Sequence, residues 1–144
     1  MAEPQLAAVR VRGDVHLVST ARDTLEMLRL YHRNYCVVVA NNPINLGMLK
    51  KVKDHITWGE INEDTLKMLV EKRAEEHKGA ETDSHKKIKY NDFIVVNNKK
   101  IKKFFRLNSP KKGYGRKGIK KSFENGGALG YRGDKINDLI MRMV

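Results

Sequence analysis

Three short stretches within the first sixty residues carry the hydrophobic pattern of β-strands. Residues 6–12 begin with apolar side chains and then alternate valine with arginine, which predicts a strand with one exposed face. Residues 35–40 are continuously apolar and rich in valine, a pattern typical of a central buried strand. Residues 57–61 form a shorter candidate. The alternation in the first stretch predicts that Arg10 and Arg12 leave the core-facing side of their strand.

Two amphipathic helices are predicted between these strands. The first opens at Ser19, with Thr20 and Asp23 spaced as a capping box. The second has Asn42 in the N-cap position and Pro43 as its first helical residue. Its apolar side chains recur every fourth residue, at Ile44, Met48 and Val52. The order β-α-β-α-β predicts an α+β two-layer sandwich of ferredoxin-like character, with both helices on one face of the sheet.

This ferredoxin-like core is predicted to span residues 1–61, and residues 62–144 are predicted to form a helical and basic-loop extension. The parts of the extension are a helix over residues 62–77 with acids in its first turn, a basic glycine-rich segment over 86–133, and a C-terminal helix over 134–143. Asp134 is the expected cap of the last helix.

The excess positive charge of the chain lies in one quarter of its length. The chain of 144 residues has a net charge of +12, and residues 86–121 hold 14 of its lysines and arginines against one acid, Asp92. The other residues carry 15 bases and 16 acids. A block of like charge repels itself and attracts a polyanion, so this segment is predicted to bind nucleic acid.

Composition narrows the function classes further. Cys36 is the only cysteine and lies in an apolar run, so we expect a small buried hydrophobe and no disulfide within the chain. No apolar run approaches the length that spans a bilayer, and the N-terminus has no signal-peptide pattern, which favours a soluble intracellular protein. The histidines show no metal-ligand spacing, and neither a cofactor nor a small-molecule substrate is expected.

Two motifs suggest phosphate chemistry and both are weak. The run Gly113–Gly118 matches the dinucleotide fingerprint, but the residues after it leave no room for the crossover helix and second strand that the fingerprint requires. The run Arg12-Gly13-Asp14-Val15 at the end of the first predicted strand, with Asn41 after the second, is similar to the phosphate loop of acylphosphatases, although the downstream arginine of that family is missing. A phosphate-handling enzyme therefore stays as an alternative.

Four segments resemble a ribosomal protein family. The predicted β-α-β-α-β core, with Asn42-Pro43-Ile44-Asn45-Leu46-Gly47-Met48 opening its second helix, resembles the universal large-subunit ribosomal protein thirty. The segments FRLNSP at 105–110, FENGGALG at 123–130 and DKINDLI at 134–140 resemble the long archaeal form and its eukaryotic counterpart, numbered seven. The resemblance covers nearly the whole chain and is weakest over residues 79–103, where this chain is shorter than the eukaryotic pattern.

This resemblance implies a non-catalytic, structural constituent of the large ribosomal subunit in the cytoplasm. The implied partners are large-subunit rRNA near its second domain, the 5S rRNA and neighbouring ribosomal proteins, with no membrane contact. An assembly factor of the same family, which leaves before the subunit matures, is a second alternative.

The residues supply a mechanism for RNA binding. Lysine dominates the basic segment, and an ammonium pairs with phosphate but lacks the planar fork that reads guanine, so we expect contacts to backbone and shape. The candidate RNA-binding residues are Arg10, Arg12, Lys102, Lys103, Arg106, Lys111, Lys112, Gly113, Tyr114, Gly115, Arg116, Lys117, Lys120, Lys121 and Arg132. The glycine-rich loop is expected to become ordered on RNA. Tyr114 stacks on an unpaired base or packs on its own loop, and both alternatives stay open.

Overall fold

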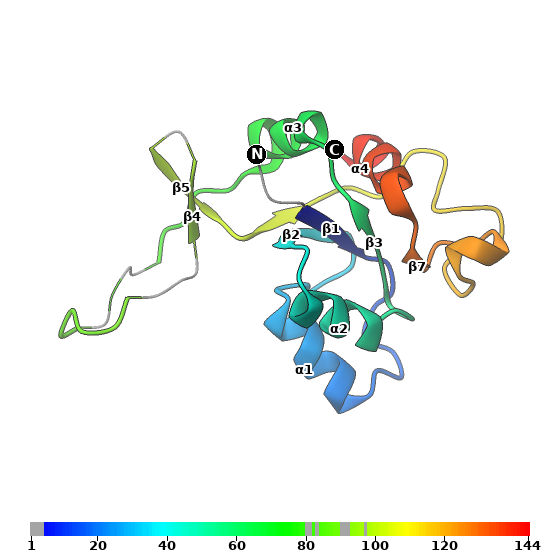
Figure 1. Ribbon diagram of the computed structural model, residues 1–144, viewed down its shortest axis with the longest axis horizontal. Coiled ribbons are helices and arrows are strands. Elements are labelled where there is room, and N and C mark those ends of the chain that lie inside the picture. The colour runs from blue at the N-terminus through cyan, green and yellow to red at the C-terminus, as the bar shows by residue number, and fades with distance from the viewer. Residues whose placement is uncertain (1–4, 80–81, 83, 90–92, 97) are drawn as a thin grey trace.

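The structure is a computed structural model that describes residues 5–79, 82, 84–89, 93–96 and 98–144. Five strands form one sheet in the order β6-β2-β1-β3-β7 (Figure 1). They are β1 (Gln5–Arg10), β2 (Tyr35–Ala40), β3 (Ile56–Glu60), β6 (Phe104–Arg106) and β7 (Gly130–Tyr131), and a separate hairpin pairs β4 (Phe93–Val96) with β5 (Lys99–Lys102). Strand β1 runs antiparallel to both β2 and β3, so the three predicted strands are confirmed with β1 at the centre.

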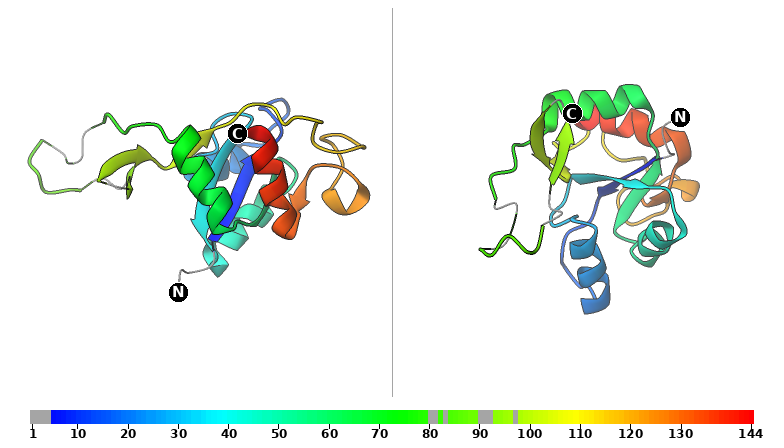
Figure 2. Two further views of the ribbon diagram at one scale, coloured as in Figure 1. Left: turned by 90° about the horizontal axis from the view of Figure 1, so that it is seen from above. Right: turned by 60° about the vertical axis from the view of Figure 1, so that its left-hand side comes forward.

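Helices cover both faces of the sheet (Figure 2). Helices α1 (Ser19–Met27) and α2 (Pro43–Lys51) lie together on one face, which confirms the predicted ferredoxin-like core. Helices α3 (Glu63–Arg73) and α4 (Ile136–Met143) lie on the opposite face. The C-terminal extension therefore adds a third layer to the predicted two, and it also supplies the two outer strands, β6 and β7.

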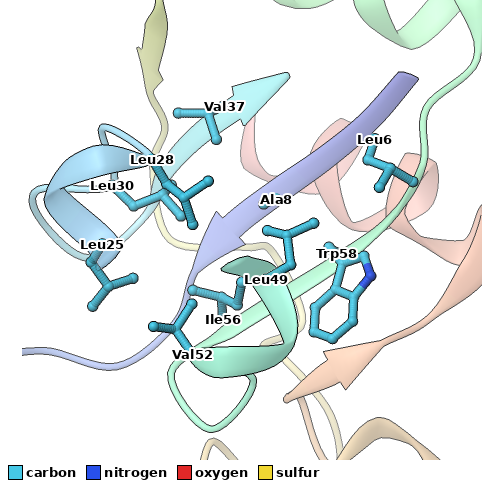
Figure 3. Packing of buried hydrophobic residues seen from close by; sticks show 10 residues of the cluster. All are labelled: Leu6, Ala8, Leu25, Leu28, Leu30, Val37, Leu49, Val52, Ile56 and Trp58. Carbon is cyan, nitrogen blue, oxygen red and sulfur yellow. The ribbon is translucent and has the colours of Figure 1, made fainter. Parts of the chain in front are cut away.

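Each face of the sheet carries its own apolar cluster. On the side of α1 and α2, Leu49 packs in a cluster with Ala8 of β1 (Figure 3). On the other side, Leu69 of α3 and Leu139 of α4 pack in a cluster with Val9 of β1. Successive side chains of a strand point to opposite faces, so β1 contributes to both clusters and is buried on both sides.

The second cluster draws on both sides of the predicted boundary at residue 61. Its buried members are Ala7, Val9, Cys36, Leu69, Phe105, Leu107, Ile136, Leu139, Ile140 and Met143. The division into residues 1–61 and 62–144 stays a prediction about chain organisation, but the packing joins the two parts through one hydrophobic cluster. Cys36 is the expected buried hydrophobe, and burial raises the pKa of its thiol to about 12.

The predicted starts of α1 at Ser19 and of α2 at Pro43 are confirmed, but the capping box predicted for α1 is wrong. The Asn42 side chain accepts a hydrogen bond from the backbone N–H of Asn45 at 2.8 Å, and Pro43 is the first helical residue. Helix α1 begins at Ser19 without any side-chain cap, so Thr20 lies inside the helix and forms no capping box.

Helix α3 ends at Arg73, before the predicted end at His77. The chain becomes extended after the helix, and residues 75–77 pair with β5. The His77 N–H donates to the Lys100 carbonyl at 2.9 Å, and the Lys102 N–H donates to the Glu75 carbonyl at 2.9 Å. The backbone N–H and carbonyl groups of residues 75–77 therefore form hydrogen bonds with β5, whereas the sequence pattern predicted hydrogen bonds within a helix.

Two further side-chain roles differ from the prediction. Ile44 is 76% exposed, and Leu49 faces the sheet instead. Asp134 lies in a 3-10 turn that precedes α4 and is not its N-cap. This turn packs directly on β3, where a Cβ added to Gly59 would lie 1.9 Å from the carbonyl oxygen of Gly133. Glycine at position 59 therefore permits contact between the two backbones.

Among the described residues, no helix is both long enough and apolar enough to cross a membrane.

We expect Leu49→Ala and Leu139→Ala each to lower the free energy of unfolding by about 2–4 kcal/mol, because both side chains are fully buried and truncation leaves a cavity. The measurement is urea denaturation followed by circular dichroism. Ile44→Ala, on the exposed side of α2, is the control and should change stability by less than about 0.5 kcal/mol. An unchanged midpoint for Leu139→Ala would show that the extension does not fold with the core.

Candidate nucleic-acid interface

The basic segment occupies both ends of the longest axis of the molecule. Residues 84–89 and the β4–β5 hairpin, here called the basic arm, project at one end, and residues 110–121, here called the basic loop, lie toward the other end (Figure 1). Strand β6 connects them along the edge of the sheet. A single run of charge in the sequence therefore becomes two separate basic surfaces.

The basic loop presents six cations to solvent. Its exposed cations are Lys111, Lys112, Arg116, Lys117, Lys120 and Lys121. The loop itself is held by backbone hydrogen bonds, among them Lys117 N–H to the Gly126 carbonyl at 3.2 Å and Ala128 N–H to the Lys121 carbonyl at 3.0 Å. The loop is therefore folded in this structure, and the dependence of its order on RNA stays a prediction.

Glycines make this loop compact. A Cβ added to Gly127 would lie 2.2 Å from the Lys121 carbonyl oxygen, and one added to Gly115 would lie 3.0 Å from the Gly127 carbonyl oxygen. Gly113 has open space around it and a φ of +74°, which favours glycine for conformational reasons. Close packing against Gly127 favours glycine at position 115, and the predicted approach of Gly115 to RNA stays a prediction.

Tyr114 packs on the protein. Its ring is half-buried against the apolar cluster that contains Val11, and its hydroxyl donates a hydrogen bond to the side-chain carbonyl of Asn34. Burial raises the pKa of this hydroxyl. Of the two alternatives for Tyr114, the structure shows packing within the chain.

The expectation that Arg10 faces solvent is wrong. Arg10 is only 2% exposed and donates to the carbonyl oxygens of Arg12 at 2.9 Å, Leu30 at 2.9 Å and Tyr31 at 2.8 Å. It also forms an ion pair with Asp14, whose pKa this hydrogen bond and charge lower. Alternation predicts an exposed face only where the sheet has one, and β1 has helices on both sides.

Arg132 is buried as well, contrary to its predicted role at an RNA surface. It is 5% exposed and donates to the Thr57 hydroxyl at 2.8 Å and the Ala128 carbonyl at 2.9 Å. Its guanidinium lies 4.8 Å from the ring centre of Phe123, and burial lowers its pKa to about 10. Arg132 therefore fixes the end of the loop to β3.

Lys102, at the end of the basic arm, and Arg106, in β6, share one acidic partner. The Glu75 carboxylate lies 3.3 Å from the Lys102 ammonium and accepts a hydrogen bond from Arg106. Burial by itself would raise the pKa of Glu75, but the hydrogen bonds and charges of Arg106 and Lys102 outweigh burial and lower it. These two cations are partly neutralised, while Lys103 and Arg12 are half-buried.

Arg33 is a cation that the sequence pattern did not single out. It is exposed, and its side chain lies over Gly13, 3.4 Å from the position of an added Cβ. The neighbouring Asn34 contacts Tyr114, which places the loop after α1 beside the basic loop. The two segments are 80 residues apart, and no local pattern indicates that they meet.

The geometry does not support the enzyme alternative. In the β1–β2 ladder, Gln5 lies opposite Ala40 and Val9 lies opposite Cys36. Asn41 is therefore beside the start of β1 and Arg12 is beyond its end, a separation of about 20 Å at roughly 3.3 Å per residue. These two side chains do not converge on one phosphate. Within the described residues, no group of three or more His, Cys, Asp or Glu side chains could hold a metal ion.

Known proteins similar to this chain are ribosomal. A family model described as ribosomal protein L30p/L7e matches residues 6–56. The large ribosomal subunit protein uL30 of Nanoarchaeum equitans is 44% identical, over 96% of this chain and 97% of the relative. The uL30 protein of Methanopyrus kandleri is 40% identical, over 93% of this chain and 100% of the relative.

This chain belongs to the L30p/L7e family. The relatives are archaeal and match along nearly their full length, extension included, which confirms the predicted resemblance to the long archaeal form. Membership also confirms the prediction of a ribosomal protein that is not an enzyme.

We expect Arg10→Met to lower the free energy of unfolding by at least about 2 kcal/mol, because it leaves buried carbonyl groups without donors. Arg116→Met removes the same charge from an exposed position and should change stability by less than about 0.5 kcal/mol. The free energies of unfolding of the two variants are measured by urea denaturation and compared with that of the unmodified protein. Equal, small effects would mean that the Arg10 hydrogen bonds do not hold the fold together.

The lowered pKa of Glu75 predicts a pH-dependent contribution to stability. A carboxylate whose pKa is lower in the folded protein stabilises it above the ordinary value of 4.5, and this contribution disappears as the pH falls through the folded-state pKa. The difference in unfolding free energy between the unmodified protein and Glu75→Gln should therefore be constant near neutral pH and shrink below pH 4.5. Denaturation curves across pH 3–7 test this, and a pH-independent difference would contradict the ion pairs.

Proposed function

We propose that this protein is a structural constituent of the large ribosomal subunit and that its basic loop binds ribosomal RNA through phosphate groups. The observation that carries the proposal is the set of six exposed cations on a loop that the fold holds in place. No acid occurs between Asp92 and Glu124, so nothing within that stretch of the chain offsets their charge. Such a surface favours a polyanion.

The chemistry of these cations favours backbone contacts. Five of the six are lysines, and an ammonium group pairs with phosphate without selecting a base. Arg116 is the one cation of the set that could form a bidentate contact. We therefore propose recognition by the position of phosphates on folded RNA, which fits the shape-based recognition of A-form helices.

The basic arm is proposed as a second RNA contact. Lys86, Lys89 and Lys99 are exposed there, away from the basic loop. The resemblance described above makes the second domain of the large rRNA and the 5S rRNA the candidate partners, together with neighbouring ribosomal proteins. Arg10 and Arg132 are excluded from the proposed contact set because both are buried.

Replacement of Lys111, Lys112, Lys120 and Lys121 by Gln should flatten the slope of log affinity against log salt by roughly 3 units. Each phosphate contact releases counterions from the RNA, so a variant that forms four fewer contacts releases fewer counterions when it binds. The measurement is filter binding of large-subunit rRNA at several salt concentrations. The matched control replaces Lys50, Lys51, Lys53 and Lys67, four exposed lysines of the body, and should leave the slope nearly unchanged. Equal slopes for both quadruple variants would place the RNA contact elsewhere.

A resident protein differs from an assembly factor in where it is found. We expect one copy for each large subunit after the subunits have been washed with salt, measured by quantitative mass spectrometry. Substoichiometric recovery that is confined to immature subunits would favour the assembly factor instead.

A further inference from the structure

Arg142 connects the C-terminal turn of α4 to the basic loop. Its Nη1 donates to two carbonyl oxygens of the loop, that of Lys111 at 3.0 Å and that of Gly113 at 2.7 Å. The backbone returns the contact, because the Lys111 N–H donates to the Arg142 carbonyl at 3.2 Å. The Arg142 Nε lies 3.4 Å from a carboxylate oxygen of Asp138, one helical turn earlier.

The turn that Arg142 holds has an unusual backbone. Lys112 has a φ of +68° and Gly113 a φ of +74°, and a left-handed conformation is uncommon for a residue with a side chain. Such conformations persist where surrounding contacts hold the backbone in place. Arg142 holds this turn through its hydrogen bonds to the carbonyls on either side of Lys112.

The Nη1 group of Arg142 is engaged by the protein. Of the five N–H groups of a guanidinium, both on Nη1 donate to loop carbonyls. The Nε is buried without a hydrogen-bond partner among the described residues, although it lies 3.4 Å from the Asp138 carboxylate. Only 26% of the side chain is exposed. These contacts favour a role inside the protein over a direct contact with RNA.

We infer that Arg142 is a positioning residue for RNA binding: it fixes the turn so that Lys111 and Lys112 are presented to phosphate in one arrangement. This inference rests on the proposed function of the basic loop. Fixing the turn in advance reduces the ordering that RNA binding would otherwise require, and it thereby raises affinity. Arginine suits this position because its planar group meets acceptors in a set geometry, which the flexible lysine ammonium does not.

The test is a double-mutant cycle on RNA affinity. Arg142→Met should weaken binding of large-subunit rRNA by roughly tenfold in the unmodified protein and by less than about twofold when Lys111 and Lys112 are already glutamine. Equal losses in both backgrounds would show that Arg142 acts independently of the two lysines and would overturn the inference. If the Lys111 and Lys112 replacements themselves leave affinity unchanged, the proposed function of the loop fails instead.

Two further variants separate geometry from charge. Arg142→Lys keeps the charge, and we expect it to lose most of the affinity that Arg142→Met loses; full recovery would overturn the positioning role. Lys135→Met removes an exposed charge at the other end of the same helix and should have little effect.

Hydrogen exchange of the free protein reports on the turn without RNA. The backbone amides of Lys111 and Gly113 should exchange faster in Arg142→Lys than in the unmodified protein, while the amides of β1 stay equally protected. Unchanged exchange at Lys111 and Gly113 would show that Arg142 does not hold the turn. All variants are compared below their melting temperatures, so that a fully unfolded variant is recognised by loss of protection in β1.

Discussion

Strand β1 pairs with β2 on one side and β3 on the other, and helices cover both of its faces. Every β1 side chain from Leu6 to Arg10 is buried, so the strand supports two apolar clusters at once. Because α3, α4 and β6 contribute to the second cluster or its edge, the extension is packed onto the core. The position of the basic loop depends on this packing, since the loop is anchored to α4 at Arg142 and to the loop after α1 at Asn34.

The fold gives the cations of this chain three different roles. Arg10 and Arg132 are buried and hold the fold together, because Arg10 donates to the Leu30 carbonyl and Arg132 donates to the Thr57 hydroxyl, both on distant segments. Lys102 and Arg106 share Glu75, which lowers the positive charge where the basic arm joins β6. The cations of the basic loop have no comparable acid beside them in the sequence, and they remain directed at solvent. The net charge of the chain therefore overstates the number of cations that are available to bind RNA.

Sequence patterns predict the fold well where the structure depends only on residues within one helix or strand. Tyr35–Ala40 is a buried strand, and Asn42 with Pro43 starts α2, because side-chain branching and capping are local properties. The burial of Arg10 and the position of the basic loop could not be predicted this way. Arg10 is buried by hydrogen bonds to the carbonyls of Leu30 and Tyr31, just after α1. The basic loop is held by α4 and by Asn34. Both depend on contacts between residues far apart in the sequence. The positions of Arg33 and Arg142 could not be predicted for the same reason, because their contacts are with residues far away in the sequence.

We propose that the basic loop, held by the folded body, contacts rRNA phosphates. Acetylation of lysines in the free protein and in salt-washed large subunits, read out by mass spectrometry, tests it most directly. We expect Lys111, Lys112, Lys120 and Lys121 to react in the free protein, where they are exposed, and to be protected in the subunit, whereas Lys50 and Lys67 change less. Loop lysines that stay as reactive in the subunit as in the free protein would show that the basic loop does not contact rRNA.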